Sequence, residues 1–368
     1  MIIKNIELDG FRNYAAVACA FDPGVNVIAG SNAQGKTNLL EAVYFLTGAR
    51  SFRTRSASDV INAGSESGSV RAGIISGGRE QFIDIYLSRS ERKKIFVNGV
   101  RMKTAWSLSG RFCCVLFCPD DLELVKGGAA ERRRFMDLAI SQLRPKYAEL
   151  LAAFNKHLED KAKILRDFRD RPDMLDVLDE FSLNMARCGA DIIRYRAAWC
   201  ARAAEAAFTV HRDISGKNEQ LRMLYRTVST VADPLKLSRA EILDRLLEHQ
   251  ESHRRAEIES GQCLSGVHKD DIYITVNGLQ ASKFASQGQI RTAALAMKLA
   301  EREICYDELG EYPVLLLDDV LSELDPARQE YVLNCIAGGQ VLISCCSGEE
   351  ILRRTGGRII RIKEGKFV

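Results

Sequence analysis

One segment of eight residues constrains the fold of this chain more than any other. It begins at Gly30, ends at Thr37 and fits the pattern G-x-x-x-x-G-K-[ST] in full. A short apolar run, 25–29, comes directly before it, and 38–43 follows with a helical pattern. A strand, a glycine-rich turn and a helix in this order predict an α/β fold.

The residue types of this segment suit the binding of a nucleotide triphosphate. Glycines let the backbone bend so that several N–H groups point at phosphate oxygens, and the helix that follows adds its positive end. Lys36 would reach the β- and γ-phosphates, and the Thr37 hydroxyl would bind Mg²⁺. We therefore predict ATP and Mg²⁺ as ligands, although an ordinary glycine turn is the alternative. The predicted cofactor-binding residues of the loop are Gly30, Ser31, Asn32, Ala33, Gln34, Gly35, Lys36, Thr37 and Asn38.

A second acidic segment lies near the end of the chain. The apolar run from Val314 to Leu317 is followed by Asp318 and Asp319. A buried strand that delivers a carboxylate at its C-terminal end is typical of the second Mg²⁺ ligand in such ATPases. Asp318 would bind the metal with Thr37, and Asp319 could polarise the attacking water. The alternative is a strand followed by an acidic helix cap.

A third motif precedes an apparent helix, 290–305. It reads Phe284-Ala285-Ser286-Gln287-Gly288-Gln289. A serine and a glycine at a helix N-terminus can form a second anion site. A simple N-cap by Ser286 is the alternative.

The composition of the chain changes between these motifs. Residues 129–259 are rich in Ala, Leu, Arg, Glu and Lys at helical spacing, with a corner at Pro172, whereas Asn98-Gly99 and Asn277-Gly278 outside this stretch are hairpin signals. We predict an ATPase head of 1–110 and 260–368. The inserted domain, 111–259, would be a helical arm with short antiparallel coiled-coil character.

Composition excludes several classes of protein. The 368 residues are 46% hydrophobic, and no apolar run is long enough to span a bilayer. The first residues, 1–7, lack the features of a signal peptide. The eleven cysteines show no metal-binding spacing and are expected to be reduced and mostly buried, which favours the cytoplasm. A net charge of +3 gives no strong nucleic-acid signal by itself.

The order of the motifs resembles the ABC-type ATPases. In that family a phosphate loop, an inserted region, a Ser-x-Gly-Gln signature, an acidic strand and a Ser-x-Leu-Asp loop follow one another, and the last is here Ser322-Glu323-Leu324-Asp325. The resemblance implies that ATP is sandwiched in a homodimer, with Ser286 capping the γ-phosphate bound by the other subunit. Lys36, Asp318, Asp319 and Ser286 would then be the catalytic residues.

Further segments resemble one branch of that family, the SMC-related RecF family. They are 6–14, 118–127, 131–137, 266–271 and 286–292, and the likeness runs across nearly the whole chain. It implies an ATP-gated dimeric DNA clamp for gap repair and SOS induction, which binds single-stranded DNA and gap junctions. RecR, RecO and RecA would be its partners, and no membrane would be involved. Arg12 would contact the phosphates of its own subunit's ATP.

Three departures from the ABC-type pattern point to a weak ATPase whose binding state matters more than its turnover. The resemblance to the RecF family implies in addition that hydrolysis is DNA-stimulated and that ATP mainly switches dimerisation. Asp319 stands where a longer Glu is usual, which weakens a general-base role. Pro119-Asp120-Asp121 occupies the region of the usual Gln loop, and the usual His after the last core strand is missing. A transporter motor would need both. An SMC-like structural or interaction ATPase with another DNA-maintenance role stays open as the alternative.

Clusters of basic residues are the candidates for DNA contact, although each could be a solvated helix face. They are Arg50, Arg53 and Arg55, then Arg132, Arg133 and Arg134, then Lys161, Lys163, Arg166 and Arg169. His268, beside Lys269 and two acids, is too little for a metal site, and a structural or inter-subunit role is preferred.

Overall fold

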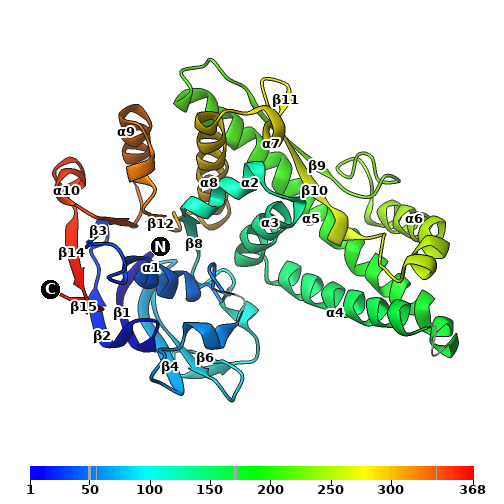
Figure 1. Cartoon of the computed structure of the whole chain (residues 1–368), viewed down its shortest axis with the longest axis horizontal. Coiled ribbons are helices and arrows are strands. Elements are labelled where there is room, and N and C mark those ends of the chain that lie inside the picture. Colours follow the sequence, from blue (N-terminus) through cyan, green and yellow to red (C-terminus); the bar gives the residue numbers. More distant parts are fainter. Residues whose placement is uncertain (49–50, 55, 169–171, 337) are drawn as a thin grey trace. The chain divides into compact units, whose positions relative to one another are not determined.

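The computed structural model describes residues 1–48, 51–54, 56–168, 172–336 and 338–368 (Figure 1). These form two compact units, Met1–Asp121 with Leu295–Val368, and Leu122–Ala294. We call them the loop unit and the signature unit, after the motifs that they carry. Their limits differ from the predicted domains, 1–110 with 260–368 and 111–259, which stay a prediction.

The loop unit contains two six-stranded sheets. The first is antiparallel, with the order β2-β1-β4-β5-β6-β7, and the second has the order β15-β14-β3-β13-β12-β8. The strands of the first sheet are β1 Ile2–Phe11, β2 Tyr14–Ala20, β4 Ser67–Ser76, β5 Arg79–Ser88, β6 Lys94–Val97 and β7 Val100–Met102. The strands of the second are β3 Val25–Ala29, β8 Cys114–Phe117, β12 Val314–Asp318, β13 Val341–Cys345, β14 Arg358–Lys363 and β15 Lys366–Phe367.

The second sheet carries the phosphate loop, and its central pairs are parallel. Every residue of β12 and β13 is buried, as expected for parallel strands covered on both faces. The helices of this unit are α1 Lys36–Phe45, α9 Pro326–Cys335 and α10 Glu349–Thr355, and α8 Gln287–Leu309 contributes residues to both units. The parallel order brings the C-terminal ends of β3, β12 and β13 to one edge.

A buried glutamine joins the two sheets of the loop unit. The Gln340 side chain accepts a hydrogen bond from Ile3 N at 2.7 Å and donates to Ile3 O and Asp22 O, both at 2.8 Å. Both ends of the amide are therefore satisfied in the core, which fixes β1 against the start of β13.

Both predicted Asn-Gly hairpins are confirmed. Asn98 and Gly99 join β6 to β7 with φ of 49° and 78°. Asn277 and Gly278 join β10 to β11 with φ of 53° and 80°. Positive φ at both central residues is the geometry that this dipeptide favours.

The signature unit is largely helical. Its helices are α2 Glu123–Lys126, α3 Ala129–Leu143, α4 Pro145–Asp167, α5 Leu178–Ile214, α6 Arg239–Ser260 and α7 Ala281–Phe284. Helices α4 and α5 pack together and run in opposite directions (Figure 1). At their joined ends Ile164 and Leu165 of α4 form an apolar cluster with Leu178 of α5 and Cys263. The short helix Pro172–Val177 lies between them, where the sequence predicts a corner.

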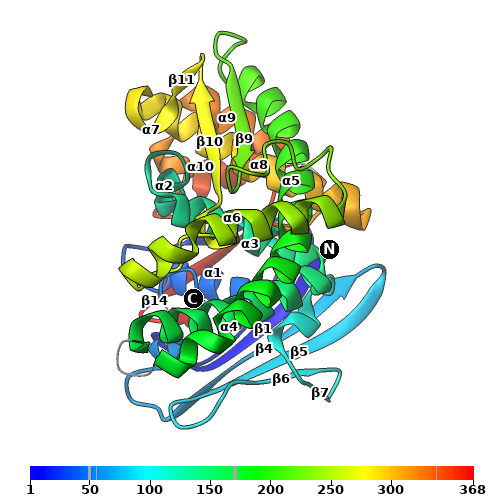
Figure 2. The same cartoon turned by 90° about the vertical axis from the view of Figure 1, so that its right-hand side faces the viewer.

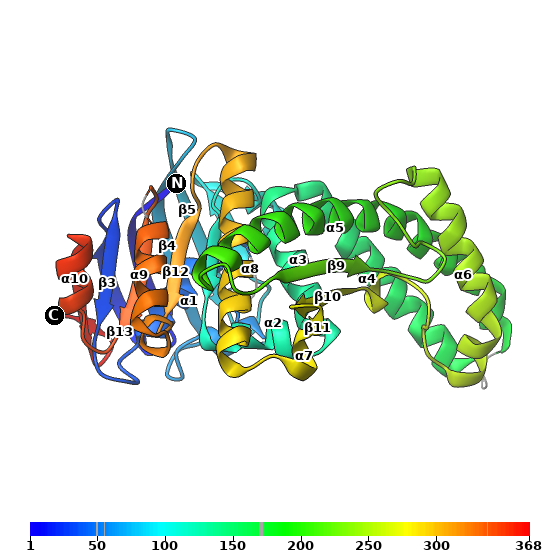
Figure 3. The same ribbon diagram turned by 90° about the horizontal axis from the view of Figure 1, so that it is seen from above.

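One small sheet completes the signature unit. It has the order β11-β10-β9, with β9 Leu221–Arg226, β10 Asp271–Val276 and β11 Leu279–Gln280. Figures 2 and 3 show β9 and β10 lying along α5. Strand β9 is thus an edge strand with a long helix behind it.

Two expectations from composition can be compared with these elements. Among the described helices, none is both long and apolar enough to cross a membrane. All eleven cysteines are free thiols and most of them are buried. Burial raises the pKa of Cys113 to about 12 and that of Cys345 to about 11, so these thiols stay protonated.

Candidate phosphate-binding site

The predicted phosphate loop lies between β3 and α1, as the motif requires. Gly35 has a φ of 119°, and a Cβ there would lie 2.8 Å from the Asn13 amide nitrogen, so only glycine fits. Ala33 is also in the left-handed region, with a φ of 64°. No side chain caps the N-terminus of α1, which leaves its first N–H groups available to an anion.

Lys36 points into the loop that it follows. Its side-chain ammonium donates to Gly30 O at 2.8 Å and to Ser31 O at 3.2 Å, and the residue is only 4% exposed. A buried ammonium held by carbonyl groups of the loop concentrates positive charge where the backbone N–H groups also converge. This arrangement can hold phosphate oxygens.

Asp318 ends β12 beside the first turn of α1. Its Oδ1 accepts hydrogen bonds from the Thr37 hydroxyl at 3.0 Å and from the Ser344 hydroxyl at 2.7 Å. Burial is the main cause that raises the pKa of Asp318, and the two hydroxyls oppose it. A buried carboxylate that accepts from two hydroxyls, one of them the Thr37 hydroxyl, fits a hard cation such as Mg²⁺.

If Mg²⁺ is bound, Thr37 and Asp318 are the residues that would hold it. The metal would neutralise charge on phosphate oxygens. Mg²⁺ usually keeps several waters and takes few protein ligands, so a pair of oxygens suffices. The described residues contain no cluster of three or more His, Cys, Asp or Glu side chains suited to a metal.

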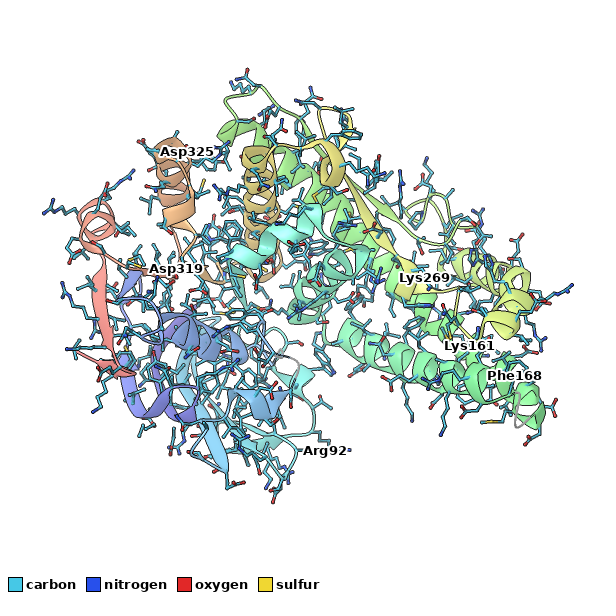
Figure 4. All side chains as sticks on the ribbon, viewed as in Figure 1. Arg92, Lys161, Phe168, Lys269, Asp319 and Asp325 are labelled. Atoms are coloured by element: carbon cyan, nitrogen blue, oxygen red, sulfur yellow. The ribbon has the colours of Figure 1, made fainter. Side chains whose placement is uncertain are left out.

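Asp319 is the second predicted acid, and it has a constrained backbone. Its φ is 53°, its N–H donates to the Ser344 hydroxyl at 2.9 Å, and its carbonyl accepts from the Ser322 hydroxyl at 2.7 Å. Figure 4 labels it at the edge where β12 ends. A non-glycine residue held in the left-handed region is typical of functional sites, and a role on the attacking water stays a prediction.

The Ser322–Asp325 segment contains a helix cap. The Asp325 carboxylate accepts from Arg328 N at 3.1 Å at the start of α9, and it pairs with the Arg328 guanidinium (Figure 4).

Asn13 braces the phosphate loop, and sequence reasoning did not find it. Its amide donates to Gln34 O at 2.9 Å and accepts from the Asn38 amide at 2.7 Å. Gly365 N donates to the same Gln34 O at 3.2 Å from the β14–β15 turn. The loop is therefore held by turns from near both ends of the sequence, and no local pattern signals such a pairing. Asn32, in the middle of the loop, accepts from the Cys346 thiol at 3.2 Å.

Arg12, predicted to contact phosphate, is paired with an acid of α1. Its guanidinium donates to both Glu41 oxygens, at 2.8 and 2.7 Å, and to Asp59 O at 2.8 Å. Glu41 is fully buried and also accepts from the Ser51 hydroxyl. Glu41 is thus the partner that positions Arg12, and contact between Arg12 and a nucleotide stays a prediction.

Ser286 lies in the signature unit, whereas the phosphate loop belongs to the loop unit. Its hydroxyl accepts from Gln289 N at 3.3 Å, while the Gln289 side chain accepts from Ser286 N at 2.8 Å. This is a reciprocal capping box at the start of α8. The Gln289 side-chain amide also donates to Glu219 at 2.7 Å, so Glu219 holds the Gln289 side chain in this orientation. Ser286 therefore caps α8, as the alternative interpretation of the sequence expects. Contact between Ser286 and a γ-phosphate stays a prediction.

Two of the candidate DNA contacts were predicted wrongly. Arg132 is 9% exposed, and its guanidinium pairs with both oxygens of Asp271. Lys161, labelled in Figure 4, is 1% exposed. It pairs with Glu257 of α6 at 2.6 Å. Each is neutralised inside the signature unit by an acidic partner that lies far away in sequence, so no local pattern indicated the pairing. Arg50, Arg55 and Arg169 lie outside the described residues, Arg133 is partly buried, and Arg53, Arg134, Lys163 and Arg166 are exposed.

His268 is partly buried in the signature unit. Its Nε2 lies 3.0 Å from Cys263 O, and its ring packs against Phe154. Burial is the main cause that lowers its pKa to about 4. A neutral, packed imidazole supports the structural role over a catalytic one.

Comparisons with known proteins identify the family of this chain. The family described as the RecF/RecN/SMC N-terminal domain matches residues 2–362. The chain is 37% identical over 377 residues to the DNA replication and repair protein RecF of Bacillus subtilis, covering 100% of both chains. It is 38% identical to the RecF of Shouchella clausii, over 91% of this chain and 90% of that one.

Solved structures give the same answer. A structure of the recombination mediator protein RecF with ATP, in the RecFOR pathway, superposes with a TM-score of 0.92 at 33% identity, covering 100% of this chain and 96% of that one. The Pyrococcus furiosus Smc head domain has a TM-score of 0.57 at 17% identity, covers 100% of this chain and 95% of that one, and shares the fold alone. The sequence identity, the coverage and the fold all place this chain in the RecF family.

Proposed function

We propose that this chain is an ATP-dependent DNA-binding mediator of recombination, in which ATP controls dimerisation. The observation that carries the proposal is the phosphate site, where Lys36, Thr37 and the buried Asp318 meet. Relatives named as DNA replication and repair proteins, and a RecF structure solved with ATP, support DNA repair and ATP as the context.

ATP with Mg²⁺ would occupy half a site on each copy. The loop unit supplies the phosphate cradle, and the exposed capping box of Ser286 and Gln289 would supply the other half from a second copy. The capping box lies at the N-terminus of α8, which is the positive end of the helix dipole, so it suits the negative charge of a γ-phosphate. The finer role would be gap repair and SOS induction with RecR, RecO and RecA, at single-stranded DNA and gap junctions in the cytoplasm.

Hydrolysis would be slow and would release the clamp. Asp319 has a shorter reach than glutamate, and its backbone is tied to Ser344 and Ser322. Lys36, Asp318 and Asp319 would act on the bound ATP of one copy, with Ser286 coming from the other. Binding state would therefore matter more than turnover.

The decisive measurement is the molar mass in solution by light scattering, with and without ATP and gapped DNA. The wild type should be monomeric without ATP and dimeric with it. Lys36→Met should lose the dimer together with DNA association, since the ammonium of the loop is gone. Ser286→Arg should lose the dimer but keep ATP binding by the monomer. Dimerisation and DNA binding that persist without ATP would refute the clamp.

A structural ATPase with another DNA-maintenance role is the alternative. It would keep DNA binding in Lys36→Met, because nucleotide would not control the DNA-binding form. The same measurement therefore separates the two functions.

A further inference from the structure

The β11-β10-β9 sheet of the signature unit has one covered face and one open face. The covered face packs beside α5 (Figure 3). Its side chains are Leu221, Met223, Tyr225, Ile272, Ile274 and Val276, all buried. Since successive residues of a strand point to opposite faces, the intervening residues belong to the other side.

The open face combines basic, aliphatic and aromatic side chains. Strand β9 contributes Arg222, Leu224 and Arg226, all exposed, and Leu224 is 59% exposed. In register, Leu224 lies opposite Tyr273, and Arg226 lies opposite Asp271. An exposed leucine between two arginines on an edge strand is a feature that a packed core does not explain.

The charges of this face are available to a ligand. Asp271 is already bound by Arg132, at 2.6 Å, so it does not neutralise the facing Arg226. The Arg226 guanidinium lies instead 3.8 Å from the centre of the Tyr273 ring. Among the described residues, neither Arg222 nor Arg226 forms an ion pair. The face is therefore positive and carries a stacked aromatic–guanidinium pair.

We propose that this open face is a stacking surface for single-stranded DNA. Unpaired bases stack on aromatic rings and on guanidinium planes, whereas paired bases in a duplex are already stacked and inaccessible. Arg222 and Arg226 lie about 13 Å apart along the strand, since each residue rises by about 3.3 Å. They would contact phosphates on either side of a short run of bases that lies against Leu224 and the Tyr273–Arg226 pair.

An acidic protein segment is the alternative ligand for this face. It could pair with Arg222 and Arg226, but it has no bases to stack on the Tyr273–Arg226 pair. The inference rests on the proposed DNA-binding function and adds to it a surface and a strand preference. The test must therefore compare single-stranded DNA, duplex DNA and dimerisation in the same variants.

The experiment measures binding of a fluorescent oligothymidylate to the full chain by anisotropy, with ATP and over a range of salt. Tyr273→Leu should weaken binding by roughly tenfold, because the stacking of one base disappears. Tyr273→Phe should keep it. The pair Arg222→Gln and Arg226→Gln should lower the slope of log affinity against log salt by about 1.4, since each phosphate that is no longer neutralised accounts for about 0.7.

Arg255→Gln is the matched control, since Arg255 is 92% exposed on α6 of the same unit. It should leave the affinity for oligothymidylate unchanged. Circular dichroism should show that Tyr273→Leu and the double arginine variant keep the wild-type fold. An oligonucleotide carrying 5-iodouracil should cross-link to a β9 or β10 residue.

Three outcomes would overturn the inference. Wild-type affinity in both Tyr273→Leu and the arginine pair would exclude the face as a DNA site. An equal loss for duplex DNA would exclude stacking, and a loss of ATP-dependent dimerisation would make the face a subunit contact. If the wild type bound no DNA at all, the proposed function itself would fail, which is a different result from any of these.

Discussion

The Thr37 hydroxyl donates a 3.0 Å hydrogen bond to Asp318, across 281 residues of sequence. The first lies at the start of α1 and the second at the end of β12, and the parallel order of β3, β13 and β12 brings them together. Two halves of a proposed Mg²⁺ site are thus joined by the sheet rather than by the chain. Because this position is buried, the charge of Asp318 affects the stability of the fold as well as the binding of metal.

Asp318→Asn should raise the thermal midpoint of the chain without nucleotide, yet abolish the further rise that Mg-ATP produces. Burial raises the pKa of the Asp318 carboxyl, so its charged form opposes folding at neutral pH. With Mg-ATP at a hundredfold excess over Kd, the wild type should gain about 2.7 kcal/mol that the variant lacks. Scanning fluorimetry with and without Mg-ATP measures both effects.

The difference in stability between the wild type and Asp318→Asn should depend on pH. A raised carboxyl pKa means that the folded state binds the proton more tightly, so the wild type should approach the variant in stability as pH falls. Asp319→Asn is the control, and it should keep the stabilisation by Mg-ATP. An equal response of Asp318→Asn and wild type to Mg-ATP would remove Asp318 from the metal site.

Glu41→Gln should destabilise the loop unit by about 3 kcal/mol, because it leaves the Arg12 guanidinium partly buried without its carboxylate. The exposed pair Lys4–Glu80 is the control, and Glu80→Gln should cost at most about 1 kcal/mol. Chemical unfolding followed by tryptophan fluorescence compares the two variants. Adding Arg12→Gln to Glu41→Gln should recover part of the loss, and a purely additive double variant would contradict the pairing.

Lys161→Met should lower the thermal midpoint by several degrees, since Glu257 would stay buried without its partner. The same turn of α4 offers a matched control in Lys163, which is exposed. Lys163→Met should leave the thermal midpoint unchanged, although it stays a candidate for DNA contact. A midpoint that falls equally in both variants would show that the ion pair is not the cause.

His268→Gln should flatten the loss of stability on acidification. Burial lowers the pKa of His268 to about 4 from an unfolded value near 6.5, so its contribution is present above pH 6.5 and is lost as pH falls towards 4. Near pH 5 the wild type should lose about 2 kcal/mol relative to neutral pH through this group. Urea unfolding at pH 7 and pH 5 measures the difference, and an unchanged difference in His268→Gln would contradict it. His253→Gln is the control.

Local sequence signals predicted the elements that depend on neighbouring residues. The loop at Gly30–Thr37, the strand that ends at Asp318 and both Asn-Gly turns are set by residues within one turn or strand. Each combines a backbone requirement, such as positive φ, with a residue type that meets it. These features could be read from the sequence for that reason.

Pairing over long distances could not be read in the same way. Lys161 and Arg132 are charged residues in helical segments, and nothing nearby indicates that Glu257 and Asp271 neutralise them. The bracing of the loop by Asn13 and Gly365 has the same origin. Burying a charged side chain is favourable only when an opposite charge is buried with it. A single sequence does not show which distant residue supplies that charge, so the burial of Lys161 and Arg132 could not be predicted.

The bracing of the phosphate loop has a consequence for synthesis of the chain. A ribosome makes Gly30–Thr37 early, but the strands that flank β3, namely β13 and β14, and the turn that holds Gln34 belong to a segment, 341–365, that is made much later. A nascent polypeptide stalled before that segment would expose the loop without its frame. Competence to retain nucleotide would therefore arise only after these strands and this turn have been made.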